Sequence, residues 1–161
     1  MRVGITGHRG LTGPIAETVR ELLQRTAADY IPADLTAVTC LADGPDTWWA
    51  DAVLDRGGRI EAVVPAQDYR AGLPDWHHAD YDRLLQAASD VHETGLTAST
   101  SEAHMAGSEI LVGLSDEILA VWDGLPARGY GGTADVVDYA RNLAVPVHIL
   151  WPTGAVRPPT T

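Results

Sequence analysis

The sequence predicts an α/β protein with a Rossmann-like fold: a mainly parallel sheet with helices on both faces. Three observations lead to this prediction. Short continuous apolar runs, typical of strands that are buried on both faces, recur along the chain. The segments between them repeat apolar residues with the period of a helix. Glycine-rich turns follow several of the runs. A chain of 161 residues has the size of one such domain.

The first half of the chain predicts three strands, at residues 2–6, 36–40 and 59–65. Between the first two, a helix begins at Gly13, and its apolar residues share one face: Ile15, Val19, Leu22, Leu23 and Ala27. A second helical stripe follows the second strand and consists of Trp48, Trp49, Ala52 and Val53. The two tryptophans are interpreted as core and rim packing.

The second half predicts helices at residues 75–89, 101–115 and 131–144, the first with Asp75 as its N-cap. Strands are expected at 90–94, 117–122 and 146–150. Right-handed crossovers place all strand-to-helix turns at one edge of the sheet, which is where ligands of such sheets bind. We expect a single domain over residues 1–151 and a flexible tail over 152–161.

Composition narrows the function classes. The net charge of −11 argues against a nucleic-acid partner, because such proteins need clustered basic side chains. No apolar run approaches the roughly 18 residues of a membrane span. Cys40 is the only cysteine, so no internal disulfide is possible. A cytoplasmic protein is expected, and apolar helix faces that look exposed favour a homo-oligomer.

Three turns at the predicted ligand edge carry the candidate site: "TGHRG" (residues 6–10, the first turn), "LADGPD" (41–46, the second turn) and "WDGLPARGYGGT" (122–133, the third turn). Glycines let backbone amides approach a ligand, and helix N-termini attract anions. The predicted ligand-binding residues are Thr6, Gly7, His8, Arg9, Asp43, Gly44, Asp46, Asp123, Gly124, Gly131, Gly132 and Thr133.

Several of these residues have two readings. Arg9 is expected to bind phosphate through its planar fork, and His8 either faces the ligand or bonds a neighbouring turn. Thr133 either contacts phosphate or caps a helix, and Asp43 and Asp46 either cap a helix or bind ribose hydroxyls.

A second group of polar residues looks like a metal-ligand set on paper, namely His77, His78, Asp80 and Asp82. However, consecutive residues of a helix point to different faces. No metal site and no cofactor are therefore expected.

The three turns, read with their flanks "GITGHRGL", "CLADGPDTWWADAVLDRGGRIEAVVP" and "SDEILAVWDG…GYGGTADVVDYARNLAVPVHIL", resemble the SLOG superfamily over about residues 2–150. This group takes its name from Smf/DprA and the lonely-guy-type phosphoribohydrolases, and the sequence looks most like its YpsA-like branch. The resemblance implies a Rossmann-like fold whose glycine-rich loops hold nucleotides or nucleotide-derived molecules. The matching positions are Gly7, His8 and Arg9; Leu41, Ala42, Gly44 and Asp46; and Gly131, Gly132 and Thr133.

One departure from the superfamily bears on catalysis. The phosphoribohydrolases carry a "PGGxGTxEE" pattern with an acidic pair, and here Asp135 stands at the first acidic position and Val136 at the second. The favoured hypothesis is therefore a sensor or carrier that binds a nucleotide-like small molecule. The alternative is a nucleoside-5′-monophosphate phosphoribohydrolase with Arg9 and Asp135 as catalytic residues. A third reading is a DprA-like DNA-processing module.

Overall fold

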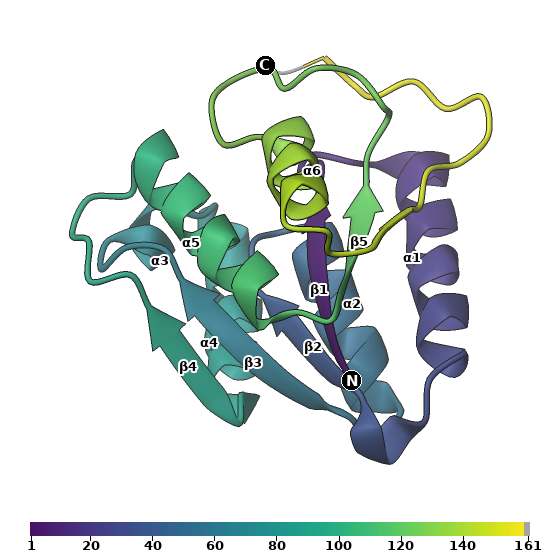
Figure 1. Cartoon of the computed structure of the whole chain (residues 1–161), viewed down its shortest axis with the longest axis horizontal. Helices are drawn as coiled ribbons and strands as arrows, with labels where there is room; N and C mark the ends of the chain where they lie inside the picture. Colours follow the sequence, from purple (N-terminus) through teal and green to yellow (C-terminus); the bar gives the residue numbers. More distant parts are fainter. Residues whose placement is uncertain (160–161) are drawn as a thin grey trace.

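The computed structural model describes residues 1–159 and confirms the predicted α/β class. Its sheet has six strands, all of them parallel, in the order β4-β3-β2-β1-β5-β6 (Figure 1). The strands are β1 (Arg2–Gly7), β2 (Thr36–Thr39), β3 (Arg59–Val64), β4 (Asp90–Glu93), β5 (Glu117–Val121) and β6 (Val147–Ile149).

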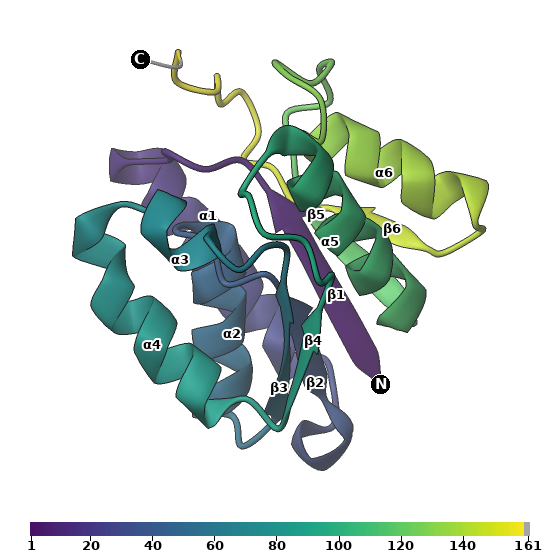
Figure 2. The same ribbon diagram turned by 90° about the vertical axis from the view of Figure 1, so that its left-hand side faces the viewer.

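Helices cover both faces of the sheet. They are α1 (Gly13–Ala28), α2 (Pro45–Asp55), α3 (Tyr69–Gly72), α4 (His78–Ala87), α5 (Ser101–Leu114) and α6 (Thr133–Asn142), with short 3₁₀ turns η1 (Pro32–Asp34) and η2 (Asp75–His77). Figure 2 shows α1, α2 and α4 on one side of the sheet and α5 and α6 on the other. This is the two-sided cover that the apolar strands predict.

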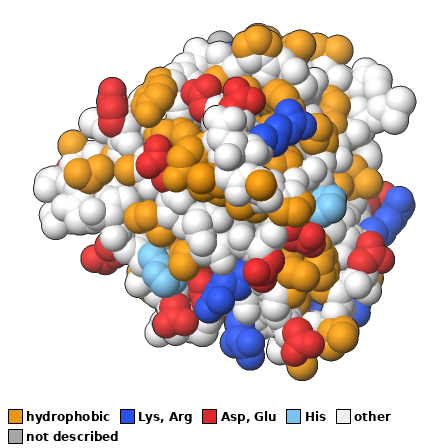
Figure 3. Space-filling view, in the orientation of Figure 1, with side chains coloured by type: hydrophobic (Ala, Val, Ile, Leu, Met, Phe, Trp, Pro, Cys, Tyr) orange, Lys and Arg blue, Asp and Glu red, His pale blue; other side chains and the backbone are white. Residues whose placement is uncertain are grey.

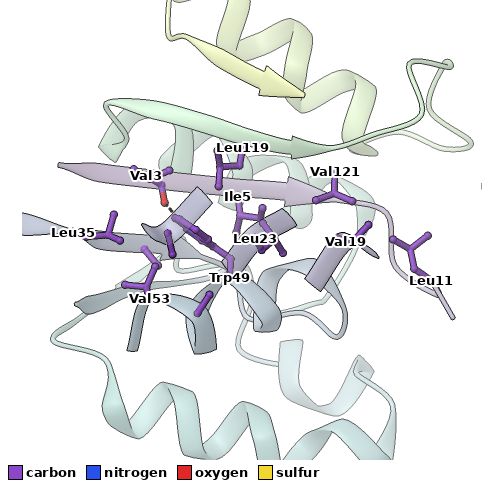
Figure 4. Close-up of a cluster of buried hydrophobic side chains, with 13 residues drawn as sticks. Val3, Ile5, Leu11, Val19, Leu23, Leu35, Trp49, Val53, Leu119 and Val121 are labelled. Carbon is purple, nitrogen blue, oxygen red and sulfur yellow. Dashed lines mark hydrogen bonds between the residues drawn. The ribbon is translucent and has the colours of Figure 1, made fainter. Parts of the chain in front are cut away.

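The core beneath α1 and α2 is built around Trp49 (Figure 4). Its indole is fully buried, and its Nε1–H donates to the backbone oxygen of Val3 at 3.0 Å. Trp48, its neighbour, lies at the rim, where the guanidinium carbon of Arg20 is 4.7 Å from the ring centroid. The division of the two tryptophans between core and rim is confirmed.

The region between β3 and β4 differs from the prediction. The expected helix at 75–89 begins as the 3₁₀ turn η2 and continues as α4. Pro74, not Asp75, occupies the N-cap position, and no side chain caps this turn. The short helix α3 was not predicted, because a helix of four residues is too short to show a helical period.

The strand order creates a crevice between β1 and β5. The connection after β1 runs to α1 on one face, whereas the connection after β5 runs to α6 on the opposite face. Such a switch point opens a crevice beyond the carboxyl ends of the two strands. We call this side of the sheet the carboxyl edge; the three glycine-rich turns meet there.

Candidate functional site

A cavity of about 240 Å³ lies at the carboxyl edge, close to the lower end of the range of small-molecule pockets, roughly 300–1,000 Å³. The whole predicted group from the first turn lines it, namely Thr6, Gly7, His8 and Arg9. The second turn contributes Asp46, and the third contributes Gly131, Gly132 and Thr133. Four other predicted residues, Asp43, Gly44, Asp123 and Gly124, are not among the lining residues.

Gly7 lies where the end of β1 meets the second turn and the end of β5. A Cβ atom at this position would lie 2.9 Å from the Cβ atoms of both Pro45 and Val121. Contacts that short do not occur without movement of the neighbours, so the end of β1 fits between β5 and the start of α2 only as glycine. Gly10, at the end of the turn, takes φ +75, a conformation that glycine adopts at little cost.

His8 is buried and links the first turn to the third. Its Nε2 lies 3.1 Å from Oδ1 of Asp123, and its Nδ1 lies 3.4 Å from Oγ1 of Thr133. Burial, and then the positive charge of Arg157, lowers the pKa of His8. The lowered pKa favours the neutral imidazole. His8 lines the cavity and also contacts the third turn, so its position is compatible with both readings of this residue.

Arg9 lines the cavity and is also paired with a buried carboxylate. Its Nε and Nη2 donate to Oδ1 of Asp43 at 2.9 and 2.6 Å. The side chain of Arg9 is 45% exposed and that of Asp43 only 9%. Asp43 therefore acts on the site by holding the guanidinium in place rather than by capping α2, whose N-cap is Gly44.

Asp46, in the first turn of α2, is an acidic group on the cavity wall. Its Oδ2 accepts a hydrogen bond from the backbone N–H of Ala42 at 3.2 Å. Burial raises its pKa to about 7, against the opposing effects of that hydrogen bond and of Arg9. Asp46 thus changes charge near neutral pH and can either donate or accept a hydrogen bond toward a ligand.

The N-terminus of α6 presents amides to the cavity. Gly132 is the N-cap, and no side chain caps the helix, so Thr133 does not act as a cap. Within residues 1–159, the backbone N–H groups of Thr133 and Ala134 have no hydrogen-bond acceptor, as is usual for the first residues of a helix. Of these two residues, Thr133 lines the cavity. Together with the helix dipole, the two N–H groups form a site that favours an anion.

Asp135 stabilises the glycine turn that precedes α6. Its Oδ2 accepts a hydrogen bond from the backbone N–H of Gly131 at 2.8 Å. Gly131 has φ +84, and a Cβ on it would lie 3.0 Å from the backbone oxygen of Ser101. The carboxylate that the sequence offered as a catalytic candidate is thus committed to fixing the glycine turn, and it is not among the lining residues.

Other parts of the cavity wall were missed by the sequence interpretation. Cys40, Tyr69, His104, Ser108, Arg128 and Arg157 also line it. His104 contacts Oγ of Ser99 through Nε2 at 2.7 Å and packs edge-on against Tyr69. Tyr69, His104, Ser108 and Arg157 come from α3, α5 and the segment after β6, so the pattern of glycine-rich turns could not reveal them. Arg128 belongs to the third turn itself, but it was not among the predicted residues.

The residues set aside as metal ligands have other partners. Nε2 of His77 lies 2.9 Å from the backbone oxygen of Leu41, and Nε2 of His78 lies 3.0 Å from that of Leu73. Across residues 1–159 there is no group of three or more His, Cys, Asp or Glu side chains suited to a metal ion. In the same residues, every helix is too short or too polar to cross a membrane.

Comparison with known proteins locates this geometry within a fold group. No protein-family model and no curated protein sequence matches the chain. Among solved structures, DNA processing protein A (DprA) from Streptococcus pneumoniae matches with a TM-score of 0.67 and 20% identity, over 92% of this chain and 49% of that chain. The chain therefore shares its fold with this structure.

Two further solved structures share this fold. DprA from Helicobacter pylori, described for its single-stranded DNA binding mode, matches with a TM-score of 0.63 and 15% identity, over 92% of this chain and 64% of that chain. The molybdenum cofactor binding protein from Rippkaea orientalis matches with a TM-score of 0.60 and 19% identity, over 92% of this chain and 74% of that chain. The chain spans about half the length of the Streptococcus DprA.

Proposed function

We propose that this protein binds a nucleotide or a nucleotide-derived phosphorylated small molecule in the carboxyl-edge cavity, as a sensor or carrier. The observation that carries the proposal is the start of α6, where, within residues 1–159, the backbone N–H groups of Thr133 and Ala134 lack an acceptor and Thr133 lines the cavity. A phosphate oxygen supplies that acceptor, and the dipole of α6 strengthens the attraction.

Other residues that line the cavity suit the uncharged part of such a ligand. Tyr69 and Leu111 offer ring and aliphatic surface, while Ser108 and Asp46 offer polar atoms. A carboxyl group with a pKa of about 7 can meet the N–H groups of a heterocycle or the hydroxyls of a sugar. A cavity with an anion-binding end and a mixed polar and apolar end fits a small phosphorylated molecule better than a polymer.

A binding role is supported over the phosphoribohydrolase alternative by the acidic positions. Asp135 accepts the N–H of Gly131, and Val136, at the second acidic position, is 2% exposed and packs in the core. Neither is placed to stabilise an oxocarbenium-like transition state. The cofactor-binding protein among the fold neighbours is compatible with a carrier role.

We propose no role in DNA processing, although two of the fold neighbours are DNA processing proteins. The net charge is −11, and acidic side chains are spread over the face seen in Figure 3. Such a field repels a polyanion, whereas a small anion needs only local amides and arginines.

Isothermal titration tests the proposal. AMP, GMP, CMP and UMP are each titrated into the protein, with the matching nucleosides as controls. We expect at least one monophosphate to bind clearly more tightly than its nucleoside, without release of free base over hours of incubation. Equal affinity for a monophosphate and its nucleoside would show that the phosphate is not bound. Release of free base would show that the protein is a phosphoribohydrolase instead.

A further inference from the structure

The segment after β6 is held against the carboxyl edge by specific contacts. The backbone N–H of Leu150 donates to the oxygen of Ala120 at 2.8 Å, which continues the pairing with β5. The indole of Trp151 meets the ring of His8 edge-on, with a centroid distance of 5.6 Å, and its Nε1–H donates to the oxygen of Ala155. Figure 2 shows this segment, coloured yellow, continuing from β6 toward the end of the molecule where the carboxyl edge lies.

With the segment in this position, Arg157 lines the cavity. The side chain is partly buried, and within residues 1–159 it makes no hydrogen bond or ion pair. The charges that act on it are the guanidinium of Arg128 and the carboxylate of Asp123. Most arginine–carboxylate pairs of this protein lie elsewhere, for example those of Arg2 with Glu61 and Arg70 with Asp82.

Arg128 lies at the same wall, and its Nη1 donates to the backbone oxygen of Pro158 at 2.7 Å. Burial, and then the charge of Arg128, lowers the pKa of Arg157. Two guanidiniums thus line the same cavity as the start of α6. An anion bound there gains charge-assisted hydrogen bonds from Arg157 and supplies an acceptor for the amides of α6.

We infer that Arg157 binds the phosphate of the ligand, and that the segment from Trp151 to Pro158 is a wall of the binding site rather than a tail. The inference rests on the proposed function and adds a residue that completes the anion-binding end. The anion is then bound by both the start of α6 and the guanidinium of Arg157, which line the same cavity.

Titration of the full-length chain tests this assignment with two probes, inorganic pyrophosphate and the monophosphate that binds best. Charge-assisted hydrogen bonds contribute about 1.5–3 kcal/mol, so Arg157→Ala is expected to weaken both probes by roughly 10- to 150-fold. The matching nucleoside is expected to bind as it does to the wild type. Arg157→Lys is expected to recover only part of the affinity, since an ammonium lacks the planar fork.

Arg56→Ala is the matched control. Arg56 is exposed at the C-terminal end of α2, away from the cavity, and its removal changes the net charge equally. If this variant weakens pyrophosphate binding as much as Arg157→Ala does, the effect is only one of net charge, and the assignment is overturned.

The outcomes separate the two claims. Loss of monophosphate binding in Gly132→Asp but not in Arg157→Ala overturns the role of Arg157 and leaves the proposed function standing. Binding of pyrophosphate that depends on Arg157, with no binding of any nucleotide, supports Arg157 and overturns the nucleotide proposal. A protein that binds neither probe contradicts both. Tighter, Arg157-dependent binding of a dT oligonucleotide would identify a nucleic-acid backbone as the source of the phosphate.

Discussion

Two helices start at the cavity, α2 after the second turn and α6 after the third, and the starts differ in charge. Both have a glycine at the N-cap and an acidic residue in the first turn. At α2 the acidic residue, Asp46, lines the cavity and keeps a pKa of about 7. At α6 the acidic residue, Asp135, turns back to the N–H of Gly131, and the cavity meets bare amides.

The neighbours of each helix start extend this difference. Pro45 begins α2 and has no N–H to offer. The charged groups beside it are the carboxylates of Asp43 and Asp46 and the guanidinium of Arg9, which pairs with Asp43. Arg128 and Arg157 lie at the cavity wall with the start of α6. The same local motif therefore yields one end suited to hydrogen-bond donors and one suited to an anion. The ligand is expected to lie with its phosphate toward α6.

The largest expected effect comes from placing a carboxylate at the anion-binding end. Gly132→Asp should reduce monophosphate affinity by more than about 100-fold, because it adds a negative charge where the amides attract one. A Cβ at this position also lies 2.9 Å from that of Ala127, so Gly132→Ala reports the steric share alone. Calorimetric titration of both variants measures the difference. Affinity retained in Gly132→Asp would place the anion elsewhere.

Arg9→Ala probes the guanidinium that lines the cavity and pairs with Asp43. We expect roughly tenfold weaker monophosphate binding, from the loss of one charged hydrogen bond. The pair with Asp43 adds a second consequence, since the carboxylate is left buried without its partner. A fall in melting temperature is therefore expected along with weaker binding. The double variant Arg9→Ala/Asp43→Asn should recover the melting temperature but not the affinity; recovery of both would reduce Arg9 to a structural role.

The acidic end predicts a pH dependence of stability. The pKa of Asp46 rises from 3.8 to about 7 on folding, so the folded protein holds a proton that the unfolded chain releases above about pH 4. The stabilisation from this proton is complete below pH 4 and is lost as the pH rises through 7. Asp46→Asn should thus melt at a higher temperature than the wild type at pH 8, with the difference shrinking toward pH 5. A constant difference across this range would show that Asp46 is charged throughout.

The sequence predicts the meeting of the three turns well, for a topological reason. Right-handed crossovers put every strand-to-helix turn at the carboxyl edge, so Gly7, Asp46 and Gly131 line one cavity without any knowledge of their contacts. The sequence could not show which side chains of the turns pair with one another. Arg9 and Asp43 are 34 positions apart, and His8 and Asp123 are 115 apart. Nothing in the local pattern shows that they pair.

Arg157 was not predicted at the cavity, for a different reason. The segment "PTGAVRPPTT" has no apolar period and is rich in proline and threonine, so a mobile tail was expected from residue 152 onward. That mobility remains a prediction, and residues 160–161 lie outside the described residues. The contacts of Trp151 with His8 and of Pro158 with Arg128 join the described part of this segment to residues far away in the sequence. Tertiary contacts of this kind carry no signal in local composition.

The smallest expected effect concerns Asp135 and decides between binding and catalysis. Its bond to the Gly131 N–H is one hydrogen bond from a carboxylate to an amide, and Asn can supply an acceptor at the same place. Asp135→Asn should thus change monophosphate affinity by no more than a few-fold, and Asp135→Ala by about fivefold, which corresponds to about 1 kcal/mol. We expect no release of free base from the wild type or from either variant. Chromatography of nucleotide incubated with each protein measures this directly. Base released by the wild type and abolished in Asp135→Asn, with affinity unchanged, would show that the carboxylate acts on the substrate and that the glycine turn holds without it.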